Sequence, residues 1–415
     1  MMPLVNVAPC SVPSRKVGSP LPTVRAEKLY KVFGRRAQEA VRRLESGTPR
    51  DELDGATAAV VDASFEVRDG EIFVVMGLSG SGKSTLLRML NGLLPATAGR
   101  VLVDGQDLTA LSKSDVRQLR SKRMSMVFQH FALFPHRTVL ENTAYGLRVQ
   151  GVARDERTQR AEEALRLVGL DGWGDRLPKQ LSGGMRQRVG LARALAADTD
   201  ILLMDEAFSA LDPLIRKEMQ DQLLQLQATL GKTIVFITHD LNEAMRLGDR
   251  IAIMRDGRIV QLGTADEILT TPADEHIARF VRDVDRSRVL TAGSVMRPPG
   301  KTLATSSGPR ASIHTMRKLE VTEMFAVDPD GGLVGIVTMA DAVAAAARGA
   351  NTVTTAVSNG FPEVPPGTPI SELFSDAAAG RPIAVVDERR RLLGAVTGSS
   401  VLEALAGKPE VSSGA

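Results

Sequence analysis

The residues with the clearest chemistry are Gly77–Thr85, which read Gly-Leu-Ser-Gly-Ser-Gly-Lys-Ser-Thr. This pattern is typical of a loop that wraps a polyphosphate when the loop lies between a strand and a helix. The apolar run Glu71–Met76 predicts a buried strand before it, and the spacing of Leu86–Leu94 predicts a helix after it. Backbone N–H groups would then bind phosphate, with Lys83 on the β- and γ-phosphates and Ser84 on Mg²⁺. The alternative is a glycine-rich turn with an ordinary surface lysine.

Two adjacent carboxylates, Asp205 and Glu206, follow the apolar run Ile201–Met204. Ligands of open α/β sheets bind at the carboxyl ends of the strands, which is where these side chains would lie. One carboxylate there suits Mg²⁺, mostly through water, and the other can orient or deprotonate an attacking water. The alternative is a pair of N-cap residues that begin the next helix.

Gln129 and His239 each follow a predicted buried strand, at Met124–Phe128 and Thr233–Thr238. A histidine at that edge can hydrogen-bond a γ-phosphate, and a glutamine can touch the metal or the attacking water. Taken alone, each is equally consistent with an ordinary loop residue.

A second candidate anion site is Leu181–Met185, Leu-Ser-Gly-Gly-Met, ahead of a predicted helix at Arg186–Ala197. The alternative is an N-cap followed by a flexible turn. Because this turn follows the first loop by about a hundred residues, one nucleotide could lie between the phosphate loop of one chain and this turn of another.

The bulk composition sets limits on the function. A chain of 415 residues predicts two or three domains. Its 52 basic and 49 acidic residues leave a net charge of +3, which gives no argument for nucleic acid. The single cysteine, Cys10, excludes a disulfide within the chain and favours a reducing compartment. No apolar run of about 18 residues predicts a membrane span, and residues 1–22 are expected to be a flexible lead without the apolar core of a secretory signal.

Strands that alternate with helices predict a doubly wound α/β domain over residues 23–285. The charged stretch Arg35–Leu53 predicts a short amphipathic helix, whose arginines are either a solvated face or a contact for lipid or a partner. The stretch Arg154–Gln180 is predicted to be a polar helix. The remaining predicted strands are Val24–Gly34, Ala59–Val67, Val101–Asp104 and the hairpin of Ile251–Arg255 with Arg258–Gln261.

An internal repeat occupies the rest of the chain. Phe325–Asp328 followed by Leu333–Thr338 matches Ala384–Asp387 followed by Leu392–Thr397, with an offset of 397 − 338 = 59 residues. Each copy predicts two strands and then a helix. We therefore expect a pseudo-symmetric pair over residues 286–410, with halves near 291–348 and 352–407, and a tail at 411–415.

Together these motifs resemble the nucleotide-binding subunits of ATP-binding cassette (ABC) transporters. The resemblance implies a P-loop NTPase fold with a helical subdomain, and ATP with Mg²⁺ as ligands. The matching segments are Gly77–Thr85 (Walker A), Gln129 (Q-loop), Leu181–Gln187 (signature), Ile201–Glu206 (Walker B), Ser209–Asp212 (D-loop) and His239 (switch histidine).

The same resemblance implies the site residues. Phe33 would stack on adenine, with Tyr30 as the alternative. Catalysis would depend on Glu206, His239 and Gln129, and the metal would be held by Ser84, Gln129 and Asp205. The other nucleotide-binding residues would be Gly77, Ser79, Gly80, Gly82, Lys83, Ser84, Thr85, Ser182, Gly183, Gly184 and Asp212.

Longer segments, such as Phe131–His136, Asp205–Arg216 and Glu243–Met254, are similar to the quaternary-amine uptake group, which imports glycine betaine, proline betaine, choline or proline. Members of that group often end in an α+β pair of cystathionine-β-synthase (CBS) domains, which the repeat resembles. Thr338–Asp341 fits the Thr-x-x-Asp pattern that can hold a nucleotide ribose, whereas Thr397–Ser400 does not. A dimerisation platform without ligand is the alternative.

The resemblance also implies the partners: a second copy of the chain, integral-membrane permease subunits and, through the complex, an extracytoplasmic substrate-binding protein. No nucleic acid is expected, and the chain is placed peripherally on the cytoplasmic face of the membrane. The alternatives are a soluble ABC ATPase acting on ribosomes or DNA, and a regulatory nucleotide-binding protein that does not hydrolyse ATP.

Overall fold

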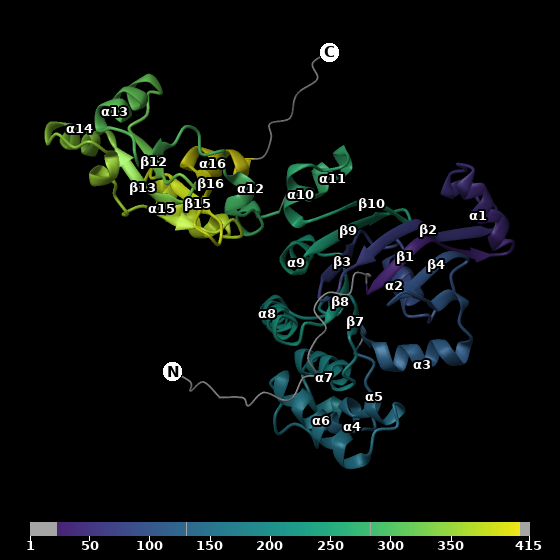
Figure 1. The fold of residues 1–415 in the computed structure, drawn as a ribbon. Helices are drawn as coiled ribbons and strands as arrows, with labels where there is room; N and C mark the ends of the chain where they lie inside the picture. Colours follow the sequence, from purple (N-terminus) through teal and green to yellow (C-terminus); the bar gives the residue numbers. More distant parts are fainter. Residues whose placement is uncertain (1–22, 130, 283, 407–415) are drawn as a thin grey trace. The chain divides into compact units, whose positions relative to one another are not determined.

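The computed structural model describes residues 23–129, 131–282 and 284–406. The expected lead at 1–22, with Cys10, and the expected tail at 411–415 lie outside these residues. The chain divides after Thr264 into two compact units, shown in Figure 1. The boundary expected at residue 285 lies about 20 residues further on, because α10 (Ala265–Thr270) and α11 (Glu275–Phe280) group with the second unit.

A six-stranded sheet lies at the centre of the first unit, in the order β10-β9-β3-β8-β7-β6. All neighbours are parallel except β10, which is antiparallel to β9. Every residue of β3, β7 and β8 is buried, as expected for parallel strands covered on both faces. The strands span β3 Ile72–Met76, β6 Met124–Val127, β7 Ile201–Asp205, β8 Thr233–Thr238, β9 Arg250–Arg255 and β10 Arg258–Gly263.

A second, antiparallel sheet has the order β2-β1-β4-β5. The core between it and the first sheet includes Phe65 and Phe73, whose rings stack with centroids 5.0 Å apart. Helix α1 buries Ala40, Val41 and Leu44 and spans only part of the stretch predicted to be helical. The elements span β1 Val24–Gly34, α1 Ala37–Glu45, β2 Ala56–Val67, β4 Ala98–Val103 and β5 Gln106–Asp107.

The helices of this unit include the predicted helical subdomain, where α4, α5, α6 and α7 lie together (Figure 1). The stretch predicted at Arg154–Gln180 is helical only to Leu167, because Gly169 follows with φ 71°. The helices span α2 Lys83–Leu90, α3 Lys113–Arg123, α4 Val139–Thr143, α5 Tyr145–Val149, α6 Arg154–Leu167, α7 Gly183–Ala196, α8 Pro213–Leu230 and α9 Leu241–Leu247, with 3₁₀ turns at Arg50–Glu52, Leu108–Ala110 and Pro178–Gln180.

The second unit confirms the internal repeat. It contains two three-stranded sheets, β11-β12-β13 and β14-β15-β16, each with one parallel and one antiparallel pair. The Leu333 N–H donates to Arg390 O at 2.9 Å, and the Leu392 N–H donates to Gly331 O at 3.2 Å. Both residues of the first bond are offset by 59 from their equivalents in the second, so the two halves meet about a local pseudo-two-fold axis.

The strands of the second unit are β11 Leu303–Ala304, β12 Glu323–Val327, β13 Leu333–Thr338, β14 Glu363–Val364, β15 Ile383–Val386 and β16 Leu392–Val396. Its remaining helices are α12 Ala292–Val295, α13 Pro309–Lys318, α14 Met339–Ala347, α15 Phe374–Ala378 and α16 Gly398–Ala406, with 3₁₀ turns at Arg286–Arg288, Val353–Ala356 and Ile370–Leu373.

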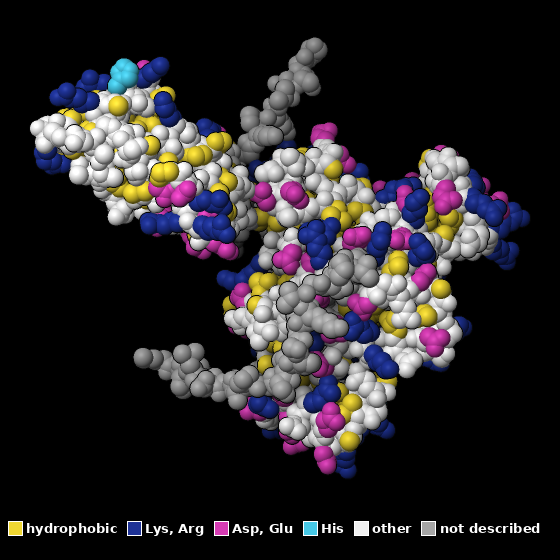
Figure 2. Space-filling view, viewed as in Figure 1, with side chains coloured by type: hydrophobic (Ala, Val, Ile, Leu, Met, Phe, Trp, Pro, Cys, Tyr) yellow, Lys and Arg dark blue, Asp and Glu magenta, His cyan; other side chains and the backbone are white. Residues whose placement is uncertain are grey.

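None of the helices in residues 23–129, 131–282 and 284–406 is long and apolar enough to cross a membrane. Basic and acidic side chains are interspersed over the face shown in Figure 2.

Candidate functional site

The loop between β3 and α2 can be formed only with glycine at two of its positions. Gly77 has φ 154°, and a Cβ on it would lie 2.1 Å from Met254 O. Gly82 has φ 100°, and a Cβ on it would lie 2.0 Å from Ala59 O. The loop therefore packs against two neighbouring strands while it turns into the helix. Helix α2 begins at Lys83, three residues earlier than predicted, because the glycine turn already directs the chain into it.

Lys83 lies inside this loop. Its side chain is 4% exposed, and Nζ donates to Gly77 O at 2.8 Å and Leu78 O at 3.0 Å. Burial lowers the pKa of the Lys83 ammonium, and the carboxylates of Glu206 and Asp205 partly offset that effect. A buried cation enclosed by a backbone loop is suited to bind an anion in the loop.

Ser84, on the first turn of α2, meets the carboxyl end of β7. Its Oγ donates to Asp205 Oδ1 at 2.8 Å, and Asp205 is 6% exposed. A hydroxyl and a carboxylate supply oxygen ligands, which Mg²⁺ prefers. No group of three or more His, Cys, Asp or Glu side chains suited to a metal occurs among the described residues. The Ser84–Asp205 pair supplies two oxygen ligands of the kind that Mg²⁺ takes.

The three predicted catalytic side chains are brought together. Glu206 Oε2 accepts from Gln129 Nε2 at 3.2 Å and lies 3.2 Å from His239 Nδ1. Glu206 has φ 44°, a left-handed conformation that is uncommon for a residue with a side chain. His239 is exposed whereas Glu206 is mostly buried, with 54% and 18% of their side chains exposed. The group thus lies at the surface beside the phosphate loop, where a water molecule can enter.

The fit of a nucleotide is tested by one buried polar atom. Ser81 Oγ, in the phosphate loop, is buried and has no hydrogen-bond partner among the described residues. The exposed loop residues Ser79 and Gly80 stand next to it. A phosphate oxygen is an acceptor that this hydroxyl lacks, so the loop fits a polyphosphate.

The second predicted anion site is an exposed helix start. Ser182 Oγ accepts from the Met185 N–H at 3.2 Å and caps α7, which begins at Gly183 and not at the predicted Arg186. A Cβ on Gly183 would meet nothing within 4 Å, whereas one on Gly184 would lie 2.7 Å from Ile215 Cγ2. Gly183 therefore faces open space, and Gly184 packs against α8.

Asp212 is exposed and caps α8, where Oδ1 accepts from the Ile215 N–H at 3.1 Å. Because Ile215 also touches Gly184, the predicted D-loop lies close to the predicted signature turn of the same chain.

The two aromatic candidates for adenine differ in exposure. Tyr30 is 5% exposed and belongs to the core under α1, whereas Phe33 is 44% exposed with Lys31 Nζ 5.1 Å from its ring centroid. Phe33 pairs with Thr57 on β2. Two residues further along β2, the carbonyl of Ala59 lies against Gly82 of the phosphate loop. At a rise of about 3.3 Å per residue, Phe33 is within reach of a base whose phosphates occupy the loop.

The sequence interpretation missed a polar network beside His239. Arg216, Asp240 and Glu243 connect the turn around His239 to the start of α8. Glu243 is 4% exposed, and burial raises its pKa. The sequence did contain a signal for this network. Glu243 lies next to the apolar residues Ala244, Met245 and Leu247 on a short helix, and a glutamate buried with them needs polar partners.

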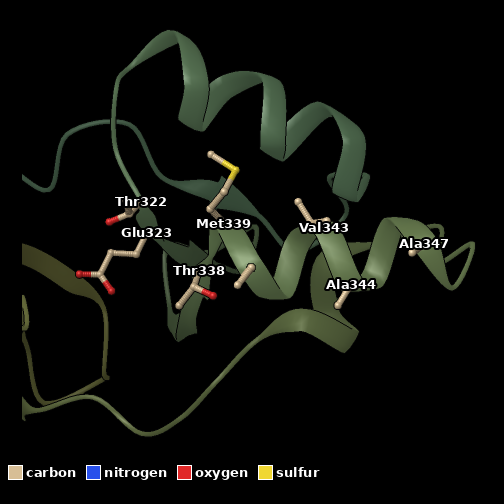
Figure 3. Close-up of a pocket in the computed structure, with 8 residues that line it drawn as sticks. Thr322, Glu323, Thr338, Met339, Val343, Ala344 and Ala347 are labelled. Carbon is tan, nitrogen blue, oxygen red and sulfur yellow. The ribbon is translucent and has the colours of Figure 1, made fainter.

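In the second unit, a shallow pocket of about 730 Å³ lies beside Thr338. Figure 3 shows Thr322 and Glu323 on one side of it, and Val343, Ala344 and Ala347 along α14. Thr338 caps α14 and donates to Asp341 Oδ2 at 2.6 Å. Burial raises the pKa of Glu323. In the second half Ser400 takes the place of Asp341, and its N–H donates to Thr397 Oγ1 at 3.3 Å.

Comparisons with protein families match both units. Residues 60–209 match the ABC transporter family, and residues 292–348 match the CBS domain family.

Individual relatives match over most of the chain. The glycine betaine transport ATP-binding protein OpuAA of Bacillus subtilis (strain 168) is 52% identical over 93% of both chains. The glycine betaine/proline betaine transport system ATP-binding protein ProV of Escherichia coli (strain K12) is 46% identical over 91% of this chain and 96% of its own. A solved dimeric ATP-binding cassette, MJ0796 bound to ADP and Pi, is 31% identical with a TM-score of 0.51, over 58% of this chain and 98% of its own.

Proposed function

Because this chain belongs to the ATP-binding subunits of ABC transporters, in the glycine betaine transport group, we propose that it hydrolyses ATP to drive the import of a quaternary-amine osmolyte. The observation that carries the proposal is the convergence of Gln129, Glu206 and His239 beside the phosphate loop. The related proteins are named as transport ATP-binding proteins, which supports this function over a soluble ATPase acting on ribosomes or DNA.

The chain's own residues account for the binding of ATP. Loop N–H groups and Lys83 bind the β- and γ-phosphates, and Phe33 stacks on adenine. Ser84, Asp205 and Gln129 would hold Mg²⁺, which would neutralise charge on the phosphates. The remaining predicted contacts are Gly77, Ser79, Gly80, Gly82 and Thr85.

Glu206 is the proposed general base. Its carboxylate is in contact with both Gln129 and His239, so a water between them and the γ-phosphate can be oriented and deprotonated. His239 holds the γ-phosphate. An intact Asp205-Glu206 pair with His239 argues against a regulatory protein that binds ATP without hydrolysis.

Two copies of the chain complete each site. The signature turn of one copy closes on the γ-phosphate that Lys83 of the other copy holds. The residues that do so are Ser182, Gly183 and Gly184, together with Asp212 of the same copy. Two observations support this arrangement: Gly183 faces open space, and the solved relative MJ0796 is described as dimeric. Paired α7 N-termini would then contribute their positive dipole ends to bound phosphate.

Permease subunits in the membrane receive the motion, and the Gln129–His136 region is the proposed contact. Phe131 and Ala132 have φ of 56° and 47°, and Arg193 donates to the carbonyls of both, at 3.1 and 2.6 Å. A strained segment fixed to α7 can pass a displacement to the signature turn. In this assembly the chain lies on the cytoplasmic face, and an extracytoplasmic binding protein delivers the solute.

The test is uptake by the assembled transporter. The full chain is reconstituted in liposomes with the permease and substrate-binding protein of a glycine betaine importer, and uptake of labelled glycine betaine is measured with internal ATP. We expect uptake, competition by proline betaine, choline or proline, and a loss of about 10²-fold or more in hydrolysis for Glu206→Gln with ATP binding intact.

The matched control is Glu218→Gln, since Glu218 is half exposed on α8. Uptake that is independent of ATP or of this chain would exclude the transport role. Normal turnover by Glu206→Gln would exclude Glu206 as the base.

A further inference from the structure

We propose that Arg216 is a positioning residue for ATP hydrolysis, which holds the turn containing His239 against the segment Ser209–Asp212. The inference rests on the proposed function, since it assigns a role in that reaction. The hydrogen bonds of Arg216 go to Asp240, Ser209 and Leu211, and not to the phosphate loop or the predicted metal ligands. Arg216 therefore acts through its neighbours.

The contacts of Arg216 bridge two loops. From α8, its NH1 donates to Asp240 Oδ2 at 3.2 Å, while NH2 donates to Leu211 O at 3.1 Å and Ser209 O at 3.4 Å. Its side chain is 28% exposed, so these bonds are partly shielded from water. A planar guanidinium can serve a carboxylate and two carbonyls at once, which a lysine ammonium cannot do with the same geometry.

The turn held by Arg216 is fixed on both sides of His239. The Asp240 N–H donates to Thr238 Oγ1 at 2.9 Å, and Thr238 Oγ1 donates to Glu243 Oε2 at 2.5 Å. Gln220 Nε2 donates to the other oxygen of Glu243 at 3.1 Å. The turn that carries the exposed His239 is therefore fixed by the buried side chains of Thr238, Glu243 and Gln220.

These bonds form a closed ring of contacts that includes Glu206, the proposed base. Ser209 Oγ donates to Glu206 O at 2.9 Å, Arg216 joins Ser209 to Asp240, and His239 returns to Glu206 Oε2. The ring contains the base and the switch histidine but not Lys83. Removing Arg216 should therefore displace the catalytic groups while the phosphate loop keeps its affinity for nucleotide.

Asp240 provides a variant that separates positioning from folding. Its Oδ1 caps α9 by accepting from the N–H groups of Asn242 and Glu243, at 2.9 and 3.2 Å, whereas Oδ2 receives Arg216. Asparagine is an N-cap as good as aspartate, so Asp240→Asn keeps the cap and removes the charge that Arg216 pairs with.

The experiment compares Arg216→Ala, Arg216→Lys, Asp240→Asn and the Arg216→Ala/Asp240→Asn double variant in the full-length chain. The readouts are kcat and KM for ATP and the dissociation constant of labelled ATP. Arg160→Ala is the matched control. Arg160 lies on α6 and its side chain is 31% exposed, and like Arg216 it donates hydrogen bonds to a carbonyl, Ala196 O, and to a carboxylate, Glu156.

We expect Arg216→Ala to lower kcat by about 10- to 100-fold, the scale of a small misplacement of catalytic groups, with KM and ATP affinity unchanged within about threefold. Asp240→Asn should lower kcat less, Arg216→Lys should recover part of the loss, and the double variant should be no slower than Arg216→Ala.

The inference is overturned if Arg216→Ala and Asp240→Asn both keep a kcat within twofold of the kcat of Arg160→Ala. It is also overturned if Arg216→Ala lowers ATP affinity by as large a factor as it lowers kcat. If wild type hydrolyses ATP and Glu206→Gln does not, such a result leaves the proposed function standing. If wild type shows no hydrolysis, it is the proposed function that fails.

Discussion

Ser84 Oγ donates a 2.8 Å hydrogen bond to Asp205 Oδ1, although 121 residues separate the two. Ser84 follows the loop after β3, Asp205 ends β7, and β8 lies between these two strands in the sheet. The bond therefore joins the phosphate loop to the carboxyl edge of the sheet, where Glu206 directly follows Asp205 in the chain.

The first prediction concerns this bond and Mg²⁺. Asp205→Asn keeps the shape but removes the negative charge, so we expect the concentration of Mg²⁺ that supports half-maximal hydrolysis to rise by about 10-fold or more. ATP binding measured in EDTA should be unchanged. Titration of ATPase activity with Mg²⁺ checks this, with the exposed Asp221 changed to Asn as control. An unaltered titration would remove Asp205 from the metal site.

The second prediction concerns Lys83. Lys83→Met removes a buried charge along with two hydrogen bonds, so the thermal midpoint of the first unit should not fall, whereas ATP affinity should fall about 10- to 100-fold. Burial lowers the pKa of Lys83, and bound phosphates would raise it again, so ATP binding should take up a proton at pH values between the lowered pKa of the free site and the raised pKa of the complex. Calorimetry in buffers of different ionisation enthalpy measures that uptake, which the variant should lack.

The third prediction separates Phe33 from Tyr30. Phe33→Ala should weaken ATP binding by about 10-fold through lost stacking, with little change in stability because the ring is exposed. Tyr30→Ala should instead lower the free energy of unfolding by about 3 kcal/mol, because it leaves a cavity under α1. Equilibrium binding and urea unfolding give the two numbers. Similar ATP affinity for Phe33→Ala and wild type would contradict the stacking role.

The fourth prediction uses the glycine pair at the start of α7. Gly184→Ala should lower stability by about 1–3 kcal/mol, because its Cβ would overlap Ile215. Gly183→Ala has free space and should fold normally, yet it should lose ATP hydrolysis if a second copy approaches that turn. Full activity of Gly183→Ala would argue against close approach of a partner.

The fifth prediction concerns Glu243 and pH. Burial raises its pKa above the usual 4.5, and hydrogen bonds from Thr238 and Gln220 partly offset that rise. The folded chain then holds a proton that the unfolded chain releases, so this group's contribution to stability is full below pH 4.5 and is lost as pH rises through the raised pKa. Relative to Glu243→Gln, wild type should lose stability over that window. Urea unfolding followed by the single tryptophan, Trp173, checks this; a constant difference would contradict it.

The sequence by itself determined the local secondary-structure elements and the types of residue that make up the site. Strands β1 and β8 begin and end at the predicted residues, because alternation and unbroken apolar runs are local properties. The 59-residue offset predicts the repeat, and the symmetric hydrogen bonds of Leu333 and Leu392 confirm it. Gly77–Thr85 was recognised because its glycines are required by backbone geometry that few other residues allow.

Only the tertiary structure decided which side chains meet. Periodicity could not choose between Phe33 and Tyr30, since the difference is burial under α1, a helix shorter than predicted. Nor could it find Arg216, whose role depends on α8, the D-loop and the turn at Asp240 arriving together. Spacing along a chain fixes which face a residue lies on, but contacts between distant segments depend on how the strands are ordered in the sheet.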